Sequence, residues 1–330
     1  MEVAQRGTSF AIGSGFTLDR HQLEQATGGG AITISQDTDV PAGKGFFNSM
    51  KFLVTTADDC ATNSDAYSWR HIIEGRNAIP LELGLASART FTLSFWIKTS
   101  VAGTYAGGFG NAANDRNYIF EYTTTGTGWE YQEISLTGDT TGTWLKTSGR
   151  GMQIKFSLGS GTNRHGTKDQ WQAGELWNTS AATDFISTNS ATMYITGIQL
   201  ELGSNATPFE YRSFGDELIR CMRYYEKTNN YDRAPGTSGG DQAQGMMVYR
   251  EGYSGSARRD ISVRFKVNKR ALPTMKGYAP NGTADKVNSP HGPANLTVYF
   301  TDIGNSGCVM YASPGSGNYY QGHWTAISEI

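Results

Sequence analysis

The sequence predicts an all-β protein, built as a jelly-roll β-sandwich, a short helix and a second, smaller β-sandwich. Glycine occupies 41 of the 330 positions and threonine 36. Glycine is typical of turns, and threonine suits the half-exposed surface of a strand. Several segments also alternate apolar and polar residues with a period of two, which is the pattern of a half-buried strand. Only one segment has the spacing of a helix.

The predicted strands are clearest where the alternation is unbroken. In residues 91–98, Phe91, Leu93, Phe95 and Ile97 share one face, and Thr92, Ser94, Trp96 and Lys98 share the other. Further strands are expected at residues 130–136, 152–158, 261–267 and 296–301. Glycine-rich stretches at 102–110, 159–166 and 313–318 are expected to be turns or loops.

The predicted helix covers residues 214–223 and begins with a capping box, Ser213-Phe-Gly-Asp216. Apolar residues then recur at three- and four-residue spacing. Because Pro208 stops strand pairing just before it, the helix is expected to join two domains. We therefore predict a carbohydrate-binding-like jelly roll at 1–212, a helical connector at 213–226 and a C-terminal β-sandwich at 227–330. A shift in net charge, from −5 in residues 1–212 to +3 in the remainder, agrees with this division.

Composition excludes several classes of protein. The net charge of −2 gives no reason to expect a nucleic-acid partner. No apolar run is long enough for a membrane span or a signal peptide. The three cysteines, Cys60, Cys221 and Cys308, are far apart and odd in number, so we expect reduced thiols formed in a reducing cytoplasm. No spacing is diagnostic of a metal site, and we predict neither a metal nor a cofactor.

Catalytic motifs are absent from the sequence. It contains no GxSxG elbow, Walker loop, HExxH or GxGxxG motif. A glycosidase needs two carboxylates across a cleft, and a pair among Glu121, Glu130 and Glu133 stays open as an alternative. Charges on exposed strand faces explain these residues more simply. We therefore expect no catalytic residues and no enzyme.

Aromatic residues offer the best candidates for a binding site, because the CH faces of sugars stack on their rings. Trp171 and Trp177 lie in a polar stretch, 159–189, and are expected on a loop. They are the first carbohydrate-binding candidates, and Trp129 and Trp69 are the second. The alternative for all four is that the rings pack against the sandwich. Trp96 lies on the polar face of its strand, which is unusual.

Several motifs, in order along the chain, resemble those of phage tail-fibre and other virion proteins that carry a carbohydrate-binding-module-like jelly roll. The opening Val3–Phe10 and Phe16–Arg20 resemble the start of that module. The matching later segments are Tyr67–Glu74, Thr92–Lys98, Ile195–Gly203, Ala206–Glu210, Glu217–Leu218, Cys221–Tyr225 and His323–Ile330. In tail fibres the module follows an attachment region and a shaft. Here it begins at residue 2 or 3, so we expect either attachment through another protein or a different place on the virion, such as the capsid or a tail collar.

The resemblance implies a phage virion structural protein, made in the host bacterial cytoplasm and located on the virion. A tail-fibre or receptor-binding component that contacts host surface glycans is the first hypothesis. A capsid-surface or fibre-connecting protein that binds other virion proteins is the alternative, and a polysaccharide depolymerase is a third. A homotrimer is the expected assembly. The sequence names neither the host nor the glycan.

Overall fold

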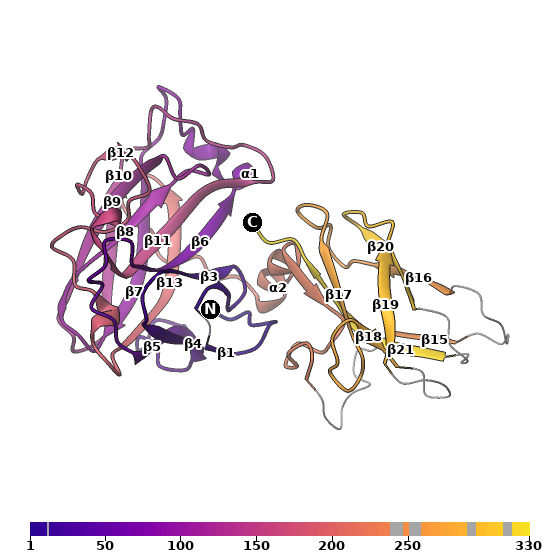
Figure 1. The fold of residues 1–330 in the computed structure, drawn as a ribbon. Helices are drawn as coiled ribbons and strands as arrows, with labels where there is room; N and C mark the ends of the chain where they lie inside the picture. The colour runs from indigo at the N-terminus through magenta and orange to yellow at the C-terminus, as the bar shows by residue number, and fades with distance from the viewer. Residues whose placement is uncertain (12, 238–246, 251–258, 289–294, 313–318) are drawn as a thin grey trace. The chain divides into compact units, whose positions relative to one another are not determined.

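The computed structural model describes residues 1–11, 13–237, 247–250, 259–288, 295–312 and 319–330 (Figure 1). These residues form two compact units. The first comprises Met1–Glu2, Thr8–Arg212 and Ile330, and the second comprises Val3–Gly7 and Ser213–Glu329. Each unit is built mainly from antiparallel strands, so the predicted all-β class is confirmed.

The segment Val3–Gly7 lies in the second unit, although it falls within the range 1–212 expected for the first domain. The Gln5 side-chain amide donates to the carbonyl of Tyr225 at 3.0 Å. Arg6 pairs with Glu329 at 2.9 Å, and its guanidinium lies 3.8 Å from the ring centroid of Tyr225. These long-range contacts have no signal in the local sequence pattern.

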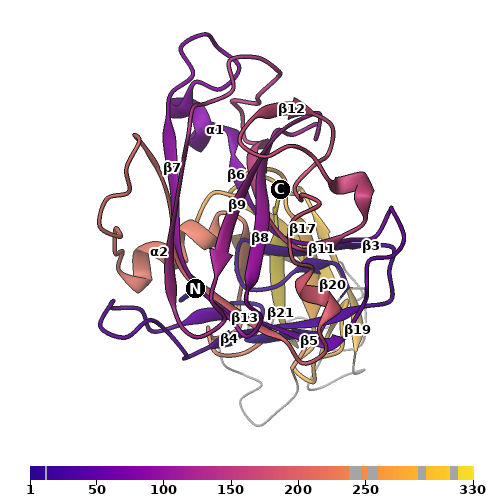
Figure 2. The ribbon, with the colours of Figure 1, turned by 90° about the vertical axis from the view of Figure 1, so that its left-hand side faces the viewer.

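The first unit is a sandwich of two antiparallel sheets. In spatial order, the six-stranded sheet contains β1 (Ser9–Ala11), β4 (Ala31–Asp37), β5 (Ser49–Thr56), β13 (Thr192–Leu202), β7 (Phe91–Thr99) and β10 (Glu130–Leu136). The seven-stranded sheet contains β12 (Trp171–Ala173), β9 (Arg116–Thr124), β8 (Gly103–Gly110), β11 (Arg150–Ser160), β6 (Ala66–Glu74), β3 (His21–Ala26) and β2 (Gly15–Phe16). In Figure 2, β7 of the first sheet stands apart from β8 and β9 of the second. Short helical turns complete the unit: α1 (Gly75–Ala78), η1 (Ile79–Leu81), η2 (Thr162–Arg164) and η3 (Phe185–Ser187).

The core of the first unit lies between the two sheets. The four apolar residues of β7 that were predicted to share a face are all 0% exposed. Among them, Phe95 packs edge-on against Phe156 of β11 at 5.1 Å and against Tyr122 of β9 at 5.2 Å. Burying a side chain of this size stabilises the fold by about 1.5–3 kcal/mol. On the opposite face of β7, Thr92 and Ser94 are also buried, whereas Trp96 and Lys98 are half-buried.

Residues 102–110, expected to be a turn or loop, instead contain the whole of β8, an interior strand of the seven-stranded sheet. The glycines of this strand are needed for close packing. A Cβ at Gly107 would lie 2.4 Å from the Phe120 ring, and one at Gly108 would lie 3.3 Å from the backbone of Trp177. The prediction was wrong because these glycines are required by the close approach of neighbouring segments and not by a turn.

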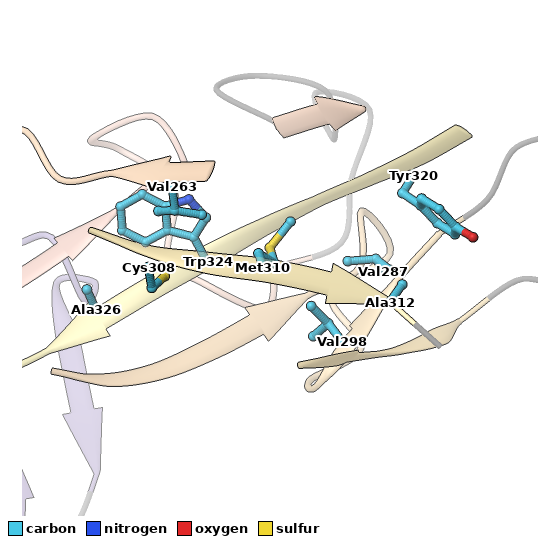
Figure 3. Packing of buried hydrophobic residues seen from close by; sticks show 9 residues of the cluster. All are labelled: Val263, Val287, Val298, Cys308, Met310, Ala312, Tyr320, Trp324 and Ala326. Atoms are coloured by element: carbon cyan, nitrogen blue, oxygen red, sulfur yellow. The ribbon is translucent and has the colours of Figure 1, made fainter. Parts of the chain in front are cut away.

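The second unit begins with α2 (Phe214–Met222), which confirms the predicted helix; Ser213 Oγ caps it by accepting the Asp216 N–H at 3.2 Å. One sheet contains β14 (Tyr225–Lys227), β21 (Tyr319–Ile327), β15 (Met247–Arg250) and β17 (Thr274–Tyr278). The other contains β16 (Arg259–Arg264), β20 (Gly307–Ala312), β19 (Leu296–Thr301) and β18 (Lys286–Val287). Both sheets contribute to the core, whose buried cluster includes Trp324 of β21 and Val263 of β16 (Figure 3). The predicted loop at 313–318 lies outside the described residues.

All three cysteines are buried. Burial is also the main reason why the pKa of the Cys308 thiol is raised to about 11.

Candidate functional site

Trp69, one of the second-rank candidates, is a core residue. It lies on β6, is 1% exposed, and packs against Phe156 at 4.8 Å and against Phe52 at 6.1 Å. A ring buried between two sheets offers no face on which a sugar can stack. The burial of Trp69 supports the packing alternative for this residue.

Trp177, a first-rank candidate, is also buried, with 3% of its surface exposed. Its ring centroid lies 4.0 Å from the Lys155 ammonium and 4.8 Å from the Arg164 guanidinium. The ring thus holds residues 164–177 against the seven-stranded sheet. The cationic neighbours of Trp177 are distant from it in the chain. The polar sequence around Trp177 therefore carried no local signal of burial and suggested an exposed loop.

Trp171 is half-buried and forms part of β12, a short edge strand rather than a loop. Its indole N–H donates to the carbonyl of Thr137 at 2.8 Å. Its ring meets Trp144 edge-on at 5.5 Å and Tyr118 at 5.4 Å. These contacts attach the segment 137–144 to the seven-stranded sheet, and they support the packing alternative for this residue.

Trp129 is the one predicted residue that lies on an open aromatic surface. It is half-buried and precedes β10. Its indole N–H donates to Asp39 Oδ1 at 2.9 Å, and its ring lies 6.3 Å from that of Tyr194 on β13. Trp129 therefore belongs to the outer face of the six-stranded sheet.

We name the set Trp96, Trp129, Tyr131 and Tyr194 the aromatic face. The register of the sheet creates it, because Tyr131 of β10 lies opposite Trp96 of β7, and Tyr194 of β13 lies opposite Lys98 of β7. The rings of Trp96 and Tyr131 are 5.2 Å apart and tilted by 51°. Tyr131 is 43% exposed, and the other three are half-buried.

Charged side chains lie among these rings. Lys98 pairs with Asp39 at 2.7 Å, and Lys51 pairs with Asp37 at 3.2 Å. Both ammonium groups lie 5.3 Å from the ring centroid of Tyr194. Partial burial alone would raise the pKa of Asp39, but hydrogen bonds from Lys98 and Trp129 bring it below its ordinary value. The carboxylate is thus held ionised, as a hydrogen-bond acceptor.

A bulge in β13 positions the loop that borders this face. The pairing of β13 with β7 shifts register between Thr196 and Gln199, and Gly197 adopts a φ of +60°. A Cβ at Gly197 would lie 2.5 Å from the Phe46 ring, so only glycine lets that ring settle on the strand. Phe46 belongs to residues 38–48, which also supply Asp39.

Sequence reasoning missed Tyr131 and Tyr194 and did not select Trp96. The available signal was an aromatic residue on the polar face of a predicted strand, which Trp96 has in the segment 91–98. Tyr131 and Tyr194 become neighbours of Trp96 only through the pairing of β10, β7 and β13. That pairing joins residues up to about a hundred positions apart, which local periodicity does not encode.

The outer face of the seven-stranded sheet is different in character, and we name its ionic residues the covered cluster. They are Glu24, Arg70, Lys155, Arg164 and Glu175. Lys155 is 2% exposed and pairs with Glu24 at 3.1 Å and with Glu175 at 3.3 Å. Arg70 pairs with Glu24 at 2.7 Å, and Arg164 pairs with Glu175 at 2.8 Å. Burial lowers the pKa of Lys155, and the two glutamates oppose this.

Neither a metal site nor a membrane-spanning helix emerges from the residues that the structure describes. No group of three or more His, Cys, Asp or Glu side chains in those residues is arranged to hold a metal ion. No helix among them is long and apolar enough to cross a membrane.

No protein-family model matches the chain, and no curated protein sequence matches it either. Among solved structures, a family 11 carbohydrate-binding module from Clostridium thermocellum, in complex with a β-1,3-1,4-mixed-linked tetrasaccharide, is 11% identical. It has a TM-score of 0.31, over 61% of this chain and 99% of that one. A family 16 carbohydrate-binding module is 13% identical with a TM-score of 0.26, over 51% of this chain and 84% of that one.

An arabinose-bound α-L-arabinofuranosidase is 12% identical with a TM-score of 0.32, over 61% of this chain. The match spans only 26% of that enzyme's chain. These likenesses concern the sandwich fold, and the case for a ligand rests on the side chains of this chain.

Proposed function

We propose that this chain is a phage virion protein, a tail-fibre or receptor-binding component, that binds a host surface saccharide on the aromatic face of its first unit. One observation carries the saccharide part of the proposal. Four aromatic side chains lie on one sheet face, partly exposed, among ionised side chains that donate and accept hydrogen bonds. The virion part is supported by the ordered sequence motifs described above.

The chemistry of this face suits a saccharide. The exposed ring of Tyr131, beside Trp96, offers apolar area to the CH face of a pyranose. Lys51, Lys98 and Asp39 offer donors and acceptors to its hydroxyl groups. A shallow platform of this kind contributes only a few kcal/mol, so we expect a dissociation constant of roughly micromolar to millimolar for one site. A homotrimer presenting three faces would strengthen adhesion through avidity.

Binding without catalysis is the activity we propose. A glycosidase requires a carboxylic acid whose pKa is raised, so that it can donate a proton to the leaving group. Asp39 has the opposite property, because its hydrogen bonds to Lys98 and Trp129 lower its pKa. A carboxylate of this kind orients a ligand but does not protonate it.

The test compares Tyr131→Ala with Tyr299→Ala. The two tyrosines are matched, with 43% and 44% exposure, but Tyr299 lies on β19 of the second unit. Purified full-length protein would be measured by calorimetry against host surface polysaccharide, and by adsorption to host cells. We expect at least a tenfold loss of affinity for Tyr131→Ala at an unchanged melting temperature, and none for Tyr299→Ala. Equal affinity of both variants and the unaltered protein would contradict the proposed site.

A further inference from the structure

Lys44 is a further cation at the border of the aromatic face. It lies in residues 38–48, between β4 and β5, and its side chain is exposed. Its ammonium lies 5.2 Å from the ring centroid of Trp96. The site proposed for the sugar ring, Tyr131 beside Trp96, therefore has a positive charge next to it.

The backbone of Lys44 is fixed at both of its polar groups. Its N–H donates to the carbonyl of Pro41 at 3.3 Å, and its carbonyl accepts a hydrogen bond from the Tyr211 hydroxyl. The next residue, Gly45, has a φ of +77°, and a Cβ there would lie 3.0 Å from that hydroxyl. Glycine is thus required at position 45 for the Tyr211 hydroxyl to approach the loop. These contacts hold the backbone of Lys44 in a defined position.

Lys44 differs from the two other lysines of this face in its electrostatic partners. Lys51 is neutralised by Asp37, and Lys98 is neutralised by Asp39. Within the described part of the chain, no carboxylate forms an ion pair with Lys44. Glu133 lies on the same side of β10 as Tyr131, and one of its oxygens accepts the Ala206 N–H at 2.7 Å. Glu133 contributes a negative charge to the same face, and the exposed ammonium of Lys44 beside Trp96 contributes a positive charge that can pair with an anionic group of a ligand.

We propose that the saccharide bound by the aromatic face is acidic, and that Lys44 pairs with the carboxylate of a sugar acid while Tyr131 and Trp96 contact its ring. This inference rests on the proposed function and narrows it to a class of ligand. An ammonium held beside an aromatic ring complements a pyranose that carries a carboxylate, because one sugar unit then meets both groups.

The test uses acidic polysaccharides and their neutral counterparts. Polygalacturonate, alginate and polysialate would each be compared with the same polymer after chemical reduction of its carboxyl groups. The proteins are the unaltered full chain, Lys44→Gln, and Lys146→Gln as a control. Lys146 is an exposed lysine of the first unit, in the segment that follows Trp144 and away from the aromatic face in sequence. Melting temperatures would verify that all three proteins are folded.

We expect the unaltered protein to bind at least one acidic polymer about three- to tenfold more tightly than its reduced form, as suits a partly exposed ion pair. Added salt should remove this preference. Lys44→Gln should bind both forms equally, with the affinity of the unaltered protein for the reduced form, and Lys146→Gln should behave as the unaltered protein.

Failure of the acidic-ligand proposal and failure of the proposed function would give different results. Binding that depends on Tyr131 but not on carboxyl reduction or on Lys44 overturns the acidic ligand and leaves the proposed function in place. If no polymer binds in either form, and host adsorption survives Tyr131→Ala, the proposed function and the acidic ligand fail together.

Discussion

The two outer faces of the first sandwich use aromatic and charged residues in opposite ways. On the six-stranded sheet, the aromatic face is partly exposed and its ion pairs lie near solvent: Lys98 and Asp39 retain 32% and 36% side-chain exposure. On the seven-stranded sheet, Lys155 of the covered cluster is paired with Glu24 and Glu175 and contacts the Trp177 ring, and its side chain retains 2% exposure. Glu175 and Trp177 supply a carboxylate and a ring that contact Lys155 there.

Residue type alone therefore does not distinguish a sheet face that can bind a ligand from one that packs against the rest of the chain. Both faces combine tryptophan, lysine and carboxylates. The decisive factor is whether another segment of the chain already satisfies those groups. A buried cation whose partners come from the same chain contributes to a single packed structure, whereas exposed pairs contribute little stability and stay accessible to a ligand.

The largest effect should come from Trp177→Ala on the covered face. We expect a loss of about 3–5 kcal/mol in the free energy of unfolding, because a buried ring is removed and a cavity replaces it. Thermal melting and urea titration would measure the loss, and saccharide affinity measured below the melting transition should stay unchanged. Lost affinity or lost adsorption to host cells at an unchanged melting temperature would instead assign Trp177 to the binding site.

The second-largest loss of stability should come from replacing a lysine of the covered cluster, compared with the same replacement of a lysine on the aromatic face. Lys155→Met removes the cation that Glu24 and Glu175 share. We expect a loss of about 2 kcal/mol, because both glutamates are partly exposed and each keeps an arginine partner. Lys98→Met on the open face should cost less than about 1 kcal/mol. Chemical denaturation of both variants gives the comparison, and equal losses would remove the proposed distinction between the faces.

Acidification should act on the seven-stranded sheet before it acts on the carboxylates. His21 of β3 lies opposite His71 of β6, with ring centroids 5.3 Å apart. Burial, followed by the charge of Arg20, lowers the pKa of His71 to about 3, and burial followed by His71 lowers the pKa of His21. Because the unfolded chain takes up these protons near pH 6.5 and the folded chain does not, stability is lost as the pH falls below 6.5, and for His71 the loss continues down to about pH 3.

Between pH 7 and pH 5 we expect a loss of up to about 2 kcal/mol for each of the two histidines. Urea titrations at both pH values would measure it. His71→Gln should reduce the pH dependence in this window, and His165→Gln serves as the control. A pH dependence that His71→Gln leaves intact would show that other groups are responsible.

The smallest effect on stability should come from Tyr131→Ala, within about 0.5 kcal/mol, because its ring is 43% exposed at a sheet edge. The same substitution should have the largest effect on saccharide binding. A change of several kcal/mol in unfolding free energy would mean that Tyr131 packs as Trp177 does, and the contrast between the faces would be lost.

The sequence by itself determined the class of fold and many elements, because alternation along a strand and capping of a helix are local properties. The strand containing Phe91–Ile97 and the helix that begins after Ser213 follow directly from such patterns. The strand β8 did not, because its glycines serve contacts with Phe120 and Trp177 from elsewhere in the chain.

Only the tertiary structure decided which aromatic residues are accessible. Trp177 lies in a polar sequence and is buried, whereas Trp96 lies in an apolar strand and borders the open face. The physical reason is that exposure depends on which distant segment covers each sheet face. Glu175 and Trp177 contact Lys155 on one face, and the register of β10, β7 and β13 gathers Trp96, Tyr131 and Tyr194 on the other.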